Sequence, residues 1–137
     1  MSAAEKDINT ALSVRLKEIQ VSDEPPIAYE NAEYIPVEGE LYLRESFIPN
    51  IKDSVGISHS DSDDYEGIYQ VSVMTGRGDR RFNAQEQARL ISVHFPRGAE
   101  YTFNGITVKI TNSRIESGII ENAWYQTPVS INWRSLS

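Results

Sequence analysis

Two stretches of the chain carry apolar residues at helical spacing, and much of the remaining sequence alternates as strands do. The first stripe consists of Ile8, Ala11, Leu12, Leu16 and Ile19, and the second of Ala84, Ala88, Ile91 and Phe95. Steps of three and four residues place each set on one side of a helix. Because two helices cannot cover both faces of a sheet, we predict an α+β fold with both helices on one face. The other face and the sheet edges must then meet solvent or another subunit.

Capping residues indicate where the two helices begin. Ser2 with Glu5, and Asn83 with Glu86, fit the reciprocal pattern in which two side chains satisfy the first free N–H groups of a helix. The first helix is therefore expected over residues 3–20, and the second is expected to follow Asn83.

Three segments between the helices have strand patterns. A short strand is expected at residues 27–29, and a longer one over residues 41–49, where Glu45 interrupts a row of apolar side chains. Residues 69–73 alternate between apolar and polar side chains and predict a strand antiparallel to the one before it.

The segment after the second helix contains the clearest local signal. Asn104-Gly105 favours a type I′ turn joining strands over residues 101–103 and 106–110. Further strands are expected over residues 115–120 and 123–134.

The last predicted strand contains a proline. The side chains expected on one of its faces are Tyr125, Val129, Ile131 and Trp133. Because Pro128 has no N–H to donate, this strand is expected at an edge of the sheet or with a bulge. The longer elements follow in the order α-β-β-α-β-β-β, which predicts a mainly antiparallel sheet in a single domain spanning residues 1–137.

Composition and charge exclude several classes of protein. Hydrophobic residues make up 39% of the 137 residues and charged residues 24%, as in globular rather than disordered or membrane proteins. The sequence contains no cysteine and no secretion signal, so we expect folding in a reducing cytoplasm without disulfides. A formal net charge of −7 argues against a protein that binds nucleic acid through its phosphates. DNA could instead pass such a surface without specific binding.

The segment over residues 52–66 is polar and acidic and predicts a mobile, exposed loop. Its acidic residues Asp61, Asp63, Asp64 and Glu66 are candidates for a surface that faces a lumen. A calcium loop is the alternative, but Tyr65 stands where a further ligand would be needed and the central glycine is missing. We therefore predict no metal site.

The segment over residues 76–81 is a basic turn between a strand and a helix. Its glycines lack the third member of a dinucleotide-binding loop, and the Lys-Ser/Thr pair of a P-loop is absent. Arg77, Arg80 and Arg81 are better interpreted as a contact patch for an acidic neighbouring surface.

Catalysis has little support in the sequence. The chain has two histidines and no Gly-x-Ser-x-Gly motif. His94 lies beside the second helical stripe and is expected to be a packing or surface histidine. His59 lies in the acidic loop, which is too mobile to hold a base in position. We predict no enzymatic activity and no cofactor.

Several phrases of the sequence, in order, resemble one family of small phage proteins. They are Pro26–Asn31 with Tyr34–Pro36, Leu41–Arg44 with Phe47–Pro49, Gly67–Val73, Phe95–Gly98 and Trp124–Ile131. The family is the tail terminators of long-tailed, lambda-like bacteriophages, and the resemblance covers nearly the whole chain. Tyr29 stands where the family usually has tryptophan, and the arginine-rich turn departs from the family pattern.

The resemblance implies a structural virion protein at the head-proximal end of the tail, assembled in the host cytoplasm. It implies a homo-hexameric ring that caps the tail tube protein, ends tube polymerisation and presents a docking surface to the head–tail connector. Tyr29, Glu30 and Asn31, together with the three arginines, are the expected oligomer or tube contacts.

Two alternatives stay open at this point. One is another phage neck or head–tail joining protein, which would share the size and ring assembly. The other is a monomeric ligand- or calcium-binding domain that uses the acidic loop.

Overall fold

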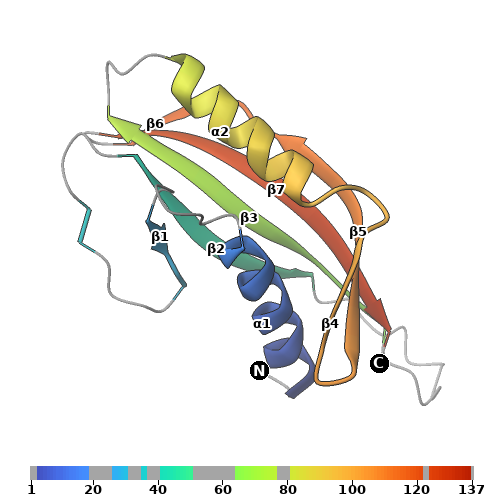
Figure 1. Cartoon of the computed structure of the whole chain (residues 1–137). Helices are drawn as coiled ribbons and strands as arrows, with labels where there is room; N and C mark the ends of the chain where they lie inside the picture. Colours follow the sequence, from blue (N-terminus) through green and yellow to red (C-terminus); the bar gives the residue numbers. More distant parts are fainter. Residues whose placement is uncertain are drawn as a thin grey trace.

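The computed structural model describes residues 3–18, 26–30, 35–36, 41–50, 64–76, 81–121 and 124–136. These residues form one sheet with two helices packed on the same face (Figure 1). The elements are α1 (Ala3–Lys17), β1 (Ile27–Ala28), β2 (Tyr42–Asn50), β3 (Asp64–Gly76), α2 (Arg81–His94), β4 (Glu100–Phe103), β5 (Ile106–Ile115), β6 (Ile119–Glu121) and β7 (Trp124–Leu136). The predicted α+β class is confirmed.

The strands lie in the order β1-β2-β3-β7-β5-β4, and β6 pairs with β7 beyond the end of β5. β1 runs parallel to β2, and every other pair is antiparallel. The centre of the sheet is the pair β3 and β7, which keeps one register over 13 residues, from Asp64 opposite Leu136 to Gly76 opposite Trp124. The strand predicted over residues 115–120 is in fact the end of β5 followed by the separate strand β6.

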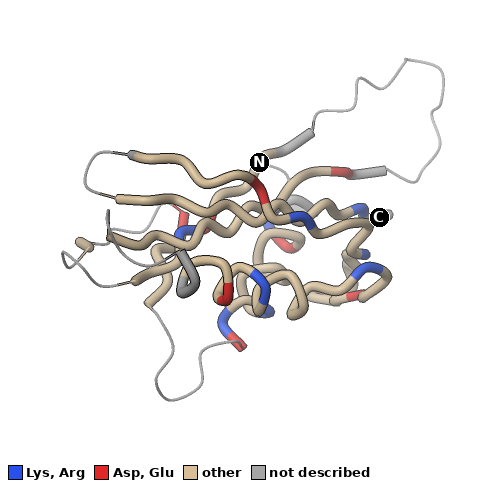
Figure 2. The backbone as a smooth tube through the Cα atoms, turned by 90° about the horizontal axis from the view of Figure 1, so that it is seen from above, with Lys and Arg blue, Asp and Glu red and all other residues tan. Residues whose placement is uncertain are grey.

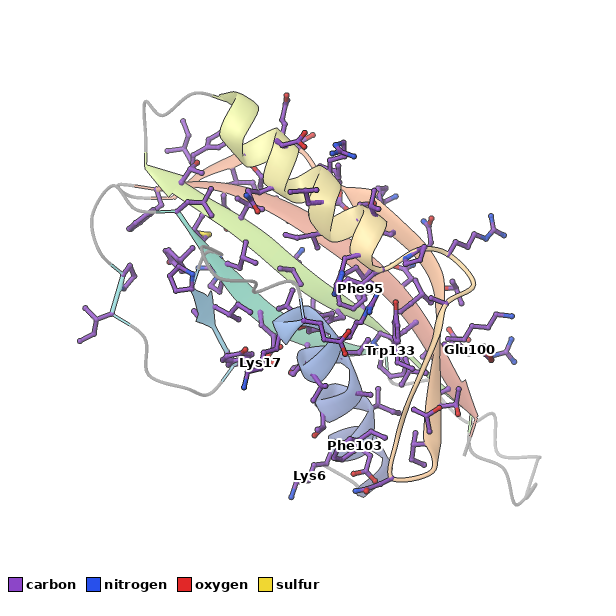
Figure 3. All side chains as sticks on the ribbon, viewed as in Figure 1. Lys6, Lys17, Phe95, Glu100, Phe103 and Trp133 are labelled. Atoms are coloured by element: carbon purple, nitrogen blue, oxygen red, sulfur yellow. The ribbon has the colours of Figure 1, made fainter. Side chains whose placement is uncertain are left out.

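The core lies between the two helices and the inward face of the sheet. The predicted helical stripes are buried: Ile8, Ala11, Leu12 and Leu16 of α1, and Ala84, Ala88 and Ile91 of α2, followed by Phe95. Inward side chains of β3 and β7 complete the cluster, and Figure 3 shows Phe95 and Trp133 in the space between helices and sheet. Helical and strand periodicity therefore identified the core correctly.

The boundaries of the helices differ from the prediction. α2 begins at Arg81, so Asn83 already has helical backbone and cannot be the N-cap. The Glu86 carboxylate binds the Arg89 guanidinium within the helix, at 2.7 and 3.1 Å. α1 ends at Lys17, before the predicted end, and residues 19–20 lie outside the described residues.

The predicted hairpin is confirmed. Asn104 has φ of 52° and Gly105 has φ of 80°, the left-handed pair that a type I′ turn requires. The flanking strands β4 and β5 pair from Phe103 opposite Ile106 outward.

The expectation that Pro128 marks an edge strand is wrong, but the pairing opposite it is irregular, because β5 ends at Ile115 opposite Val129 and β6 resumes at Ile119 opposite Gln126. β7 is an interior strand, with β3 on one side and β5 and β6 on the other. The Pro128 carbonyl accepts a hydrogen bond from the Glu116 N–H at 2.8 Å. In an antiparallel strand the N–H and C=O of one residue point to the same neighbour, so the missing donor faces the interruption between β5 and β6. No ladder hydrogen bond is lost there.

The helix-free face is partly covered by its own side chains. The rings of Tyr42 and Trp124 meet edge to face, with centroids 5.2 Å apart, across the buried Met74. Beside them the Gln126 amide donates a hydrogen bond of 2.9 Å to the Ser72 hydroxyl, and both residues are buried. At this end of the helix-free face, the strands' own side chains are buried although neither α1 nor α2 covers them.

Charges of both signs are interspersed along the described chain (Figure 2). Neither α1 nor α2 is long and apolar enough to cross a membrane.

Candidate functional site

A buried carboxylate on the inner face of β2 joins this strand to α1, β3 and the segment after β1. Glu45 is 4% exposed, and its Oε2 accepts hydrogen bonds from the Tyr69 hydroxyl at 2.6 Å and the Ser13 hydroxyl at 2.7 Å. Its Oε1 accepts the Glu30 backbone N–H at 3.3 Å. The sequence suggested that Glu45 interrupts the inward row of β2. In the structure its side chain points inward with that row and holds α1, β3 and the segment after β1 together.

Two phenols near this carboxylate have raised pKa values. Burial, together with the charge and hydrogen bond of Glu45, raises the pKa of Tyr69 well above its usual value. Burial and the Glu45 charge also raise the pKa of Tyr29. Both phenols stay protonated at neutral pH, so Tyr69 can act as a permanent donor to Glu45.

The outer edge of β2 is closed by groups of the same chain. The Phe47 N–H donates to the Glu30 carboxylate at 2.7 Å, and the Leu43 N–H donates to the Pro26 carbonyl at 2.9 Å. A blocked edge cannot readily accept a strand from another molecule. Tyr29 and Glu30, which we predicted as interface residues, thus also have roles inside the subunit, and Asn31 lies outside the described residues.

The charged segments predicted as contacts are described only in part. Arg77 and Arg80 lie outside the described residues, and Arg81 is the first residue of α2. Asp61 and Asp63 also lie outside them.

The predicted acidic loop extended too far along the chain. Asp64 and Glu66 belong to β3, opposite Leu136 and Arg134 of β7, so the strand begins at Asp64. The roles of these residues in a lumen stay predictions.

The opposite side of the sheet is open. β5 pairs with β7 as far as Ile115, and β6 resumes the pairing at Ile119 opposite Gln126. Among the described strands β6 pairs with β7 alone. Ile115, Ile119 and Ile120 are 43%, 53% and 61% exposed, respectively. We call residues 115–120 the β5–β6 edge.

A surface hollow of about 510 Å³ lies where β2, β3, β7 and β5 meet. Its lining comprises Ile48, Glu66, Gly67, Ile68, Thr111, Asn132, Trp133 and Arg134. Gly67 is needed here because a Cβ would come within 2.6 Å of the Trp133 ring. Gly67 thus lets the Trp133 indole pack directly against the backbone of β3.

His94, at the end of α2, packs against α1. Its Nε2 lies 2.6 Å from the Arg15 carbonyl, and its own carbonyl accepts hydrogen bonds from the Arg15 guanidinium and the Tyr101 hydroxyl. Burial lowers the pKa of His94 below its usual value. The described residues contain no group of His, Asp and Glu arranged to hold a metal ion.

Comparison with known proteins identifies the family. A family model described as "Phage tail terminator protein" matches residues 7–133. The chain belongs to the phage tail terminator family. It is therefore a structural protein of a phage tail and a component of the virion, working in contact with other tail components.

Comparison with solved structures shows that other proteins have the same fold over nearly the whole chain. Five chains of solved structures match. One of them, whose name describes no function, superposes with a TM-score of 0.80 at 22% sequence identity, over 98% of this chain and 96% of that chain. At this identity the likeness concerns the fold alone. No curated protein matches the sequence.

Proposed function

We propose that this chain is a tail terminator whose identical copies close into a six-membered ring on the head-proximal end of the tail tube. The ring ends tube polymerisation and presents the surface on which the head connector docks. The observation that carries the proposal is the open, apolar β5–β6 edge on a subunit of a structural tail family. Six copies of 15.5 kDa give a ring of about 93 kDa.

The work of the subunit in this proposal is geometric rather than chemical. Its buried carboxylate, Glu45, is engaged with donors of its own chain and positions elements instead of facing a substrate. We further propose that the whole chain acts as one domain and that catalysis, cofactors and metals play no part. DNA passes the ring without specific binding, because a subunit of net charge −7 repels phosphate.

The arginines of the basic turn are proposed contacts to an acidic surface on the tube or on a neighbouring copy. Reversing the charges of Arg77, Arg80 and Arg81 to glutamate should then reduce capping of tubes. Rings that form and cap tubes normally with this variant would remove the basic turn from the proposal.

Deletion of the gene tests the function directly. Without a terminator, tube polymerisation has no stop, so electron microscopy should show tubes longer than those of the parent phage. Restoring the intact protein should restore normal length. Tails of normal length that fail to join heads would instead identify a neck protein on the connector side, and would contradict the proposal.

A further inference from the structure

Among the described strands, none pairs with the outer side of the β5–β6 edge. β4 covers β5 only as far as Lys109, and Gly98 and Ala99 pair with Ile110. From residue 112 to the end of β6, no described strand lies beyond. The free N–H and C=O groups of such an edge can pair with another chain unless the edge is blocked. The contrast with β2, whose edge is blocked by Glu30, makes the subunit asymmetric.

Apolar side chains concentrate on this edge. Three of the eight large hydrophobic residues exposed in the described part of the chain are Ile115, Ile119 and Ile120. Successive residues of a strand point to opposite faces, and Ile119 and Ile120 stand opposite Gln126 and Tyr125, respectively. Apolar side chains therefore lie on both faces of the sheet at this edge. This arrangement suits a partner that contacts the sheet at its edge.

The edge also has a fixed shape. The Glu116 N–H is bound to the Pro128 carbonyl, and Gly118 packs so closely under Tyr125 that a Cβ would overlap the phenol. The turn from β5 into β6 is thus held against β7 before any partner arrives. A preformed surface loses little conformational freedom on binding.

Charge indicates which partner fits. Every copy carries −7, so a contact between two copies is favoured where the meeting surfaces are uncharged or of opposite sign. At this edge Arg114 and Glu116 pair with each other at 2.9 Å, and residues 117–120 carry no charge. An oppositely charged partner would be better met through the acidic segments of the chain than through this neutral one.

We propose that the β5–β6 edge is the surface through which one copy contacts the next copy of this chain. This inference rests on the proposed ring and identifies its subunit interface. In a ring of more than two copies this contact is head-to-tail, so the edge meets a different surface of the next copy. Repetition of such a contact closes a ring when the rotation allows it.

An exposure-matched pair of variants tests the interface. Ile120→Asp places a carboxylate on the edge, and Val93→Asp places one on the outer face of α2; both residues are 61% exposed. Burying an unpaired charge at a contact weakens it strongly, so Ile120→Asp should weaken assembly by roughly a hundredfold or more. Val93→Asp should assemble like the parent. Ile120→Ser, which removes apolar area without adding charge, should give an intermediate loss.

Mass measurements across a concentration series, for the free protein and for protein bound to tail tubes, supply the readout. Circular dichroism and thermal unfolding of each variant verify that it folds. Loss of assembly by Ile120→Asp but not by Val93→Asp supports the interface. Rings formed equally by both variants overturn the edge assignment while leaving the proposed ring intact. A parent protein that stays monomeric in both settings overturns the proposed function and this inference together, and binding of tube protein alone to the edge overturns the choice of partner.

Discussion

Replacing Tyr69 with phenylalanine isolates one hydrogen bond of the buried carboxylate network. The hydroxyl donates to Glu45 Oε2 at 2.6 Å, and both residues are buried. A hydrogen bond to a charged group contributes about 1.5–3 kcal/mol, and the ring itself stays in place. Because Ser13 and the Glu30 N–H still bind the carboxylate, we expect Tyr69→Phe to lower the free energy of unfolding by about 2 kcal/mol.

Tyr101→Phe is the matched control. Its hydroxyl donates to the His94 carbonyl at 3.2 Å, and that carbonyl keeps its bonds from Arg15, so the loss should be about 0.5 kcal/mol. Urea denaturation followed by circular dichroism, at concentrations where the protein is monomeric, measures both changes. Equal losses for the two variants would refute the reasoning that Glu45 is the stronger acceptor.

The same hydrogen bond predicts a dependence on alkaline pH. Because the folded pKa of Tyr69 is raised, the phenol ionises first in the unfolded chain. The stability that it contributes is complete below a pH of about 10, the ordinary pKa of tyrosine, and declines above it. The decline should be smaller in Tyr69→Phe than in the parent, and identical slopes would contradict the raised pKa.

Three further predictions concern local packing. Burial lowers the pKa of His94, so the unfolded chain takes up the proton first and stability should fall as the pH drops below about 6.5; His94→Gln should reduce that slope in unfolding curves. Gly67→Ala should destabilise by about 2 kcal/mol because its methyl group overlaps Trp133, and a Trp133→Phe background should relieve part of that loss in chemical denaturation. Gly105→Ala, at a φ of 80°, should lower the thermal midpoint with a loss of about 1 kcal/mol, and no change would contradict the turn.

Features that depend on local pattern could be predicted from the sequence. The apolar stripes of both helices, the Asn104-Gly105 hairpin and the inward face of β7 all follow from spacing and turn chemistry within a few residues. The family resemblance followed from the order of several short phrases along the chain, and the family model matches residues 7–133.

Features that depend on distant partners could not be predicted in this way. The role of Glu45 could not be predicted, because its donors Ser13 and Tyr69 lie 32 and 24 residues away in the chain. Pro128 suggested an edge because nothing local reveals that β5 and β6 leave a gap opposite it. In both cases the tertiary structure resolves the conflict: it supplies donors to Glu45, and among the described residues it places no acceptor opposite the missing N–H of Pro128.

The candidate contact surface was missed for a similar reason. Residues 115–120 predicted a strand, but only the sheet order shows that the outer side of β6 has no partner among the described strands. The available signal was the Ile-Ile pair after Gly118. This pair indicates a contact surface only once both side chains are known to be exposed. Sequence reasoning instead favoured charged residues as contacts.

Symmetry at the tube end tests the central claim most directly. Purified protein added to growing tail tubes should appear in electron microscopy as a six-fold density on one end, with a mass of about 93 kDa, and elongation should stop there. Bare ends on tubes that keep growing, with the protein left in solution as a 15.5 kDa monomer, would contradict the account.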